Sequence, residues 1–172
     1  NVLAIGVWND GAPGADDLVI VPRLAVGADW RQVDYDDGSW SSGSFGLGYE
    51  LAPPGAESLI VTNVPAQTTS VFTRTTFEVA NPAAVTQLLL GADYDDGFVA
   101  WLNGVAIYGS PEMGASTSWD AGVMPHESSN GAAPRYAPLR DFSAAAIPAR
   151  RNGRNVLAIG VWDATLPSSD LV

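Results

Sequence analysis

Residues 71–79 alternate between two kinds of position, and this alternation is the clearest local pattern in the chain. One set of alternate positions carries Val71, Thr73, Thr75, Phe77 and Val79. The positions between them carry Phe72, Arg74, Thr76 and Glu78. A period of two places successive side chains on opposite faces of a sheet, so this pattern predicts a β-strand with two unequal faces.

Two apolar runs joined by an Asn-Gly pair predict a β-hairpin. The runs are residues 98–102 and 105–108, and the pair is Asn103 and Gly104. Both residues of the pair tolerate the positive φ angles of a type I′ turn, which matches the twist of the flanking strands. A further apolar run covers residues 86–92. The segment therefore predicts short strands joined by tight turns.

The remaining segments contain little helix and one long loop. Only residues 83–88 and 142–149 could be helical, and both segments are short. Residues 111–138 are rich in Gly, Ser, Ala and Pro without a period, which is typical of a surface loop, with room for a short strand near Trp119. Long loops often carry binding residues. The pattern as a whole predicts an all-β fold.

An eight-residue sequence occurs twice in the chain. Asn1–Trp8 and Asn155–Trp162 both read NVLAIGVW, and residues 15–19 match residues 168–172 more loosely. A period of this length indicates an array of whole domains rather than a solenoid.

The repeat also predicts where one module ends and the next begins. Residues 1–24 are expected to be the closing strands of a preceding repeat, and residues 25–172 one further repeat that lacks its last strand. The residues expected at the interface between copies are Val2, Leu3, Ile5, Val7, Trp8, Leu18, Ile20 and Val21.

Composition and charge exclude several classes of binding partner and site. The chain has 172 residues, the size of one domain, with 18 Gly and 12 Pro. Nineteen acidic residues oppose eight arginines, for a net charge of −11, so nucleic acid and anionic lipid are poor partners. No apolar stretch approaches the roughly 20 residues of a membrane-spanning helix, so no membrane insertion is expected in this segment. Cysteine is absent, which excludes disulfides and thiolate metal sites within the chain.

Several segments, taken in order, resemble a known family. They are YDDGSW at 35–40, GLGY at 46–49, VFTRTTFEVANPAAV at 71–85, DYDDGFVAWLNGVAIYGS at 93–110 and NGRNVLAIGVW at 152–162. Residues 25–172 thus resemble the galactose-binding-like modules repeated in large bacterial secreted and surface proteins, and are similar to the sugar-binding domain of family 2 glycoside hydrolases. The resemblance implies a jelly-roll β-sandwich with antiparallel sheets and long loops, in an extracellular or cell-surface setting. The fold alone implies no activity.

Two acidic turns share the string Tyr-Asp-Asp-Gly, each preceded by a further aspartate. Their acidic residues are Asp34, Asp36 and Asp37 in the first turn and Asp93, Asp95 and Asp96 in the second. Clustered carboxylates suit calcium, which takes six to eight oxygen ligands, so calcium is the candidate cofactor. The alternative is that Asp and Gly occupy these turns for backbone reasons.

The long loop holds the candidate residues for a glycan site. They are Trp119, His126, Glu127, Arg135 and Tyr136, because sugars stack on flat aromatic rings and bind polar side chains at their edges. The alternative is that loop aromatics pin the loop to the sheet. Trp8, Trp101 and Trp162 lie within or at the end of apolar strands, which indicates a role in the core or at an interface.

No catalytic motif accompanies these features. The chain contains no GxSxG, HExxH or phosphate-binding glycine loop, and nothing singles out one pair among its 19 acidic residues, so we expect no enzyme activity. The leading hypothesis is a non-catalytic repeat module of an extracellular protein, in which copies build a fibre or stalk through module-to-module contacts or strand complementation. The alternative is a lectin-like module that binds glycans and could depend on calcium.

Overall fold

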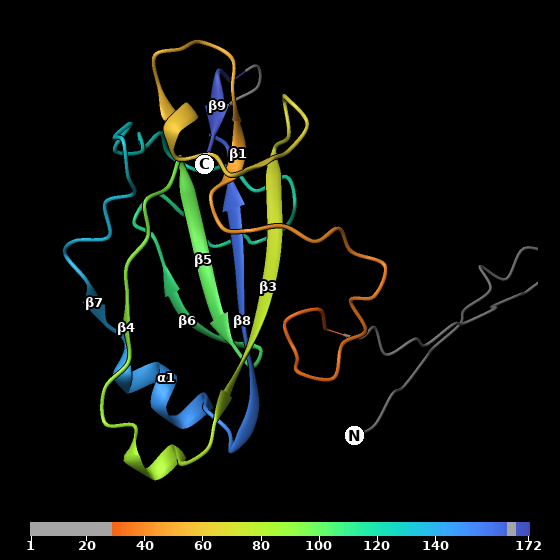
Figure 1. Cartoon of the computed structure of the whole chain (residues 1–172), viewed down its shortest axis with the longest axis vertical. Helices are drawn as coiled ribbons and strands as arrows, with labels where there is room; N and C mark the ends of the chain where they lie inside the picture. Colours follow the sequence, from red (N-terminus) through yellow and green to blue (C-terminus); the bar gives the residue numbers. More distant parts are fainter. Residues whose placement is uncertain (1–28, 165–167) are drawn as a thin grey trace, which may run out of the picture.

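The computed structural model describes residues 29–164 and 168–172 (Figure 1). The closing strands expected at residues 1–24, together with all of the interface residues named above, lie outside the described residues. Most of the regular structure in the described part consists of β-strands, and the only α-helix there is α1 (Ser143–Ala149). The all-β prediction is therefore confirmed. None of the described helices is long and apolar enough to cross a bilayer.

A four-stranded antiparallel sheet forms the centre of the molecule. Its strand order is β3 (Ser70–Val79), β8 (Gly153–Trp162), β5 (Gly97–Leu102) and β6 (Val105–Gly109). β8 pairs with β3 from one end to the other and with β5 along its C-terminal part. The repeated sequence NVLAIGVW therefore occupies a strand with neighbours on both edges.

The predicted hairpin and the predicted strand at residues 71–79 are both confirmed. β5 and β6 are joined by Asn103 and Gly104, whose φ angles are 51° and 85°. Asn and Gly adopt positive φ more readily than other residues, so this pair specifies the turn locally. The strand at residues 71–79 is β3, and it begins one residue earlier than the alternation predicts.

Smaller elements surround the central sheet. β1 (Leu47–Glu50) lies between β2 (Thr62–Asn63), to which it is parallel, and β9 (Asp170–Leu171), to which it is antiparallel. β4 (Leu89–Leu90) pairs with β7 (Arg140–Asp141). In Figure 1, β1 and β9 lie at the end of the sheet opposite α1.

The short helices and the long loop differ in detail from the sequence prediction. The 3₁₀ helices are η1 (Ala56–Ser58) and η2 (Pro82–Ala84), so residues 83–88 are helical only at their start. Within the loop at 111–138, a single bridge between Met113 and Val123 replaces the short strand expected near Trp119. The apolar run at 86–92 contains only the two-residue β4.

The core lies between the central sheet and the segments that cross it. All six residues of β5 are buried, and Trp162 of β8 is fully buried. The Trp162 indole packs edge-on against Phe72 at 5.4 Å between ring centroids, and its Nε1–H donates to the Ser118 carbonyl at 2.7 Å. Trp101 is also buried, which confirms that both tryptophans belong to the core. The long loop is thereby held against the sheet.

Two hydrogen-bonded asparagines, Asn103 and Asn155, lie at the N-terminal end of β8. Asn155 at the start of β8 is fully buried, and its Oδ1 accepts from Asn103 Nδ2 and from the Arg151 backbone N–H, each at 2.8 Å. Asn103 Oδ1 in turn accepts from the Val156 backbone N–H at 2.8 Å. The motifs LNG and NVLAI, which are 50 residues apart in the chain, are therefore joined by a direct side-chain contact.

Replacement of Asn155 by alanine should destabilise the module. The change removes the acceptor of the buried Asn103 amide and of the partly buried Arg151 N–H, and such a loss costs about 1–3 kcal/mol for a buried group. We expect the free energy of unfolding in urea to fall by about 2–4 kcal/mol for the two groups together. Asn63→Ala, at an exposed strand position, is the control, with a change of at most about 0.5 kcal/mol. Equal losses for the two variants would contradict this role for Asn155.

Candidate functional site

Three chain segments meet beyond the C-terminal end of β8. The acidic turn before β5 donates two backbone N–H groups, from Asp95 to the Val172 carbonyl at 3.0 Å and from Asp96 to the Trp162 carbonyl at 3.2 Å. The third segment is the part of the long loop around His126, whose N–H donates to Asp96 Oδ1 at 2.8 Å. Two backbone hydrogen bonds and one to the Asp96 side chain therefore hold the turn between β8, Val172 and the loop.

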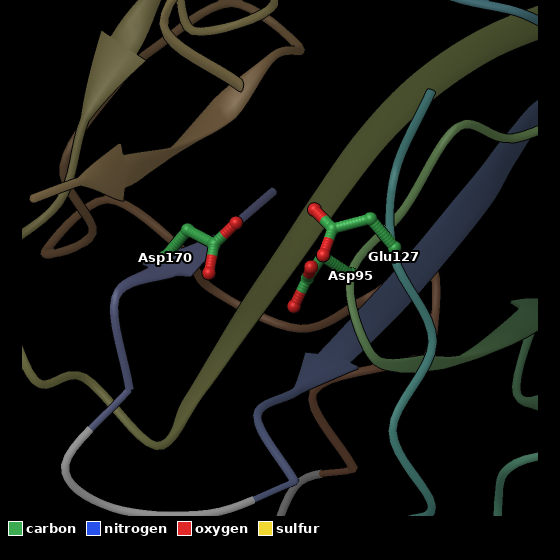
Figure 2. A group of neighbouring side chains, drawn as sticks. All are labelled: Asp95, Glu127 and Asp170. Carbon is green, nitrogen blue, oxygen red and sulfur yellow. The ribbon is translucent and has the colours of Figure 1, made fainter. Parts of the chain in front are cut away.

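The side chains of Asp95, Glu127 and Asp170 form a cluster at this junction, which we call the acidic cluster. Each offers a carboxylate oxygen, and these oxygens all lie within 4.8 Å of one another. Figure 2 shows the three carboxylates directed toward a common region from the turn, the long loop and β9. In the described residues this is the only such group of three or more His, Asp or Glu side chains.

Asp95 is the buried member of the acidic cluster. It is 4% exposed, and no hydrogen-bond donor of the described residues reaches its carboxylate. Burial, with the nearby negative charges of Asp96, Asp170 and Glu127, raises the pKa of Asp95 to about 8. The protein thus places a carboxylate where its charge is opposed both by loss of water and by like charges.

The carboxylates of the other two members, Glu127 and Asp170, each accept one side-chain hydrogen bond. Ser169 Oγ–H donates to Asp170 Oδ1 at 2.9 Å, and Asn130 Nδ2–H donates to Glu127 Oε1 at 2.8 Å. Burial raises the pKa of Asp170 despite the Ser169 hydrogen bond, with Glu127 and Glu50 adding to the rise. The ion pairs of the described residues, Arg31–Asp29 and Arg74–Asp37, include no member of the cluster.

The first acidic turn has a different structure. Asp37 forms an ion pair with Arg74, whose guanidinium also donates to the Gln32 and Tyr35 carbonyls at 2.8 and 3.1 Å. Asp36 Oδ1 accepts from the Gly38 N–H at 3.0 Å. Asp34 is exposed. These carboxylates are not among the grouped acidic side chains of the described residues, and only Asp36 accepts the local backbone hydrogen bond that the alternative expects.

Asp93, in the second turn, positions the loop. Its carboxylate accepts from the Ser129 N–H at 2.8 Å, from the Ser129 hydroxyl and from the Arg135 N–H at 2.7 Å. Burial alone would raise the pKa of Asp93, but these hydrogen bonds lower it below its ordinary value. Only Asp95 of the second turn belongs to the acidic cluster. Asp170 was not predicted, although Asp17 stands at the matching position of the first copy.

A cavity of about 390 Å³ lies beside the acidic cluster. Its wall includes four of the five predicted glycan-site residues, His126, Glu127, Arg135 and Tyr136. Tyr94 stacks on the His126 ring at 4.2 Å between centroids, with an angle of 9° between the planes. Glu127 belongs to both the cavity and the cluster, so the two features share one wall.

Trp119 lies away from this cavity. Its side chain is 65% exposed, and its carbonyl accepts from the Ser70 hydroxyl at 2.8 Å, at the start of β3. Sequence proximity in the long loop suggested a single site, but the loop separates Trp119 from the other four residues. Comparisons with protein-family models, with curated proteins and with solved structures found no match for the chain.

Replacement of Asp93 by alanine should loosen the wall of the cavity. The Ser129 and Arg135 N–H groups would lose their acceptor, so we expect faster amide hydrogen exchange at both residues, measured by NMR. The free energy of unfolding should fall by about 1–3 kcal/mol. Asp120→Ala, at an exposed acidic residue of the same loop, should change neither quantity. Unchanged exchange in Asp93→Ala would show that the loop does not depend on Asp93.

Proposed function

We propose that the chain is a non-catalytic module of an extracellular tandem-repeat protein, with a galactose-binding-like jelly-roll fold. In this proposal, neighbouring copies build a fibre or stalk on the cell surface. One observation carries the proposal: the sequence that occurs twice forms the central strand β8.

A central strand requires partners that only a complete module supplies. Asn155, Val156, Ala158 and Trp162 of β8 are all fully buried, and the strand has paired neighbours on both edges. The copy at residues 1–8 carries the same eight side chains. Exposing such a strand would leave apolar surface and backbone groups without partners, so this copy is suited to the centre of a second module of the same design.

The register of β9 suggests how neighbouring modules could be joined. β9 pairs with β1 so that Leu171 lies opposite Tyr49. In the first copy the residues after the matching Leu18-Val19 are IVPRL, at 20–24. If β9 continued past Val172 with this segment, in the same register, the residue equivalent to Ile20 would lie opposite Leu47 of β1. Supplied from another copy, residues 20–24 would extend the β1 sheet by strand addition.

Removal of residues 1–24 should therefore abolish association between copies. We expect the chain of residues 1–172 to form oligomers whose size grows with protein concentration, measured by light scattering after size-exclusion chromatography. A chain of residues 25–172 should stay monomeric, because it lacks the donated strand.

A five-residue extension provides the matched control. When IVPRL is added after Val172 of the full chain, this segment would pair with β1 of its own molecule. It would thus occupy the position that residues 20–24 of another copy would take, so oligomers should disappear. The free energy of unfolding should also rise by about 1–3 kcal/mol, because at least one apolar side chain becomes buried. An extension of SGSGS should do neither. A full chain that remains monomeric at all concentrations would contradict strand donation.

The cavity favours a second candidate function, a carbohydrate-binding module. Its volume of about 390 Å³ is that of a small-molecule site, and aromatic rings lie beside an arginine and a carboxylate in its wall. Tyr136 is 54% exposed, so its ring is accessible to a sugar. The gathering of four predicted residues in one wall supports this candidate.

Two aromatic variants separate this cavity from the rest of the loop. If the module binds glycans here, a glycan array should give a sugar-specific signal that Tyr136→Ala reduces at least tenfold. Trp119→Ala should retain the signal, because Trp119 does not line the cavity. Repeating the array with a chelator shows whether binding depends on calcium. No signal with the parent chain, or a loss only with Trp119→Ala, would exclude this cavity as a glycan site.

A further inference from the structure

Asp95 differs from the other acidic residues at this end of the molecule. Asp93 accepts three hydrogen bonds from the loop, and Asp96 accepts from the His126 and Ala164 N–H groups at 2.8 and 2.6 Å. Asp163 accepts from the Tyr49 hydroxyl at 3.0 Å. The Asp95 residue is only 4% exposed, and no hydrogen bond of the described residues ends on its carboxylate, whose oxygens keep some contact with solvent.

A carboxylate that has little contact with water and accepts no hydrogen bond is costly, and here two further carboxylates approach it. A charged group removed from water requires a counter-ion, a hydrogen bond or a proton. The Asp95 side chain is directed toward Glu127 and Asp170 (Figure 2), and their oxygens lie within 4.8 Å of one another. No arginine of the described residues forms an ion pair with this group. A cation between the three side chains would offset the repulsion.

We propose that the acidic cluster of Asp95, Glu127 and Asp170 binds a calcium ion. All of its ligand atoms are carboxylate oxygens, which hard divalent cations prefer, and three carboxylates carry six oxygens in total. His126 is not part of the cluster, because its Nδ1 faces the Tyr94 carbonyl at 3.1 Å. The absence of nitrogen and sulfur ligands disfavours zinc and copper. Calcium tolerates ligands from flexible loops better than magnesium does.

The positions of the three ligands along the chain give the ion a structural role. Asp95 lies in the turn before β5, Glu127 in the long loop and Asp170 in β9. Calcium would thus hold the last strand and one wall of the cavity to the end of the central sheet. The site is independent of both proposed functions, since it would stabilise a spacer and a glycan-binding module alike.

Calcium titration of the purified chain tests the site. After treatment with a chelator and dialysis, calcium chloride should produce a saturable heat of binding in calorimetry. The melting temperature should rise with the logarithm of free calcium, because the ion binds the folded state. Glu127→Gln should weaken calcium binding at least tenfold, and the exposed position of Glu127 makes this variant safe for folding.

The melting temperature of Asp95→Asn separates calcium binding at the acidic cluster from a non-specific effect of calcium on stability. In chelator this variant should melt at a higher temperature than the parent chain, because Asn needs neither the charge nor the proton uptake that is costly for Asp95 beside two carboxylates. In saturating calcium the variant should instead melt at a lower temperature than the parent chain, because it lacks one of the ligands. Asp36→Asn, which alters the first acidic turn, is the matched control and should keep the full calcium response.

Three outcomes would overturn the proposal. The first is no heat and no melting shift for the parent chain at millimolar calcium. The second is an equal calcium shift in the parent chain and in both Asp95→Asn and Glu127→Gln, which would place the ion elsewhere. The third is a larger shift with magnesium than with calcium at the same concentration. If Asp95→Asn fails to fold, Glu127→Gln and Asp36→Asn still decide the result.

Discussion

The structure depends on strand β8, which buries one face in the core and is paired on both edges along its C-terminal part. β8 carries residues whose side chains have no contact with water, and its backbone groups are matched by β3 on one edge and β5 on the other. Such a strand is stable only when the other segments surround it, because apolar side chains and unpaired backbone groups are both costly in water. The long loop and the chain end complete this enclosure.

The polar side chains at the two ends of β8 differ in how completely they are hydrogen-bonded. At its start, Asn155 and Asn103 match their donors and acceptors with one another and with the backbone. At its end, Asp95 is buried beside two carboxylates and accepts no hydrogen bond from the described residues. A network with complete pairing stabilises the fold by itself. The proposed calcium ion would supply the missing partner at the other end.

The proposed functions share this junction. Glu127 lies in both the acidic cluster and the cavity wall, and Asp170 lies in β9, the strand whose continuation would join neighbouring copies. Binding of an ion at this position would therefore affect the order of the cavity and the position of the last strand together. The net charge of −11 is concentrated in part at this site, which favours a cationic ligand over an anionic one.

The amino-acid sequence by itself determined the local elements and the repeat. The alternation at 71–79 predicted β3, and Asn103-Gly104 predicted the hairpin, because strand period and turn angles depend on adjacent residues. Only the tertiary structure decided which carboxylates meet. Asp37 pairs with Arg74, Asp95 meets Glu127 and Asp170, and Trp119 is separated from Tyr136. These contacts depend on the path of long loops over the central sheet, and the spacing of residues along the chain does not specify that path.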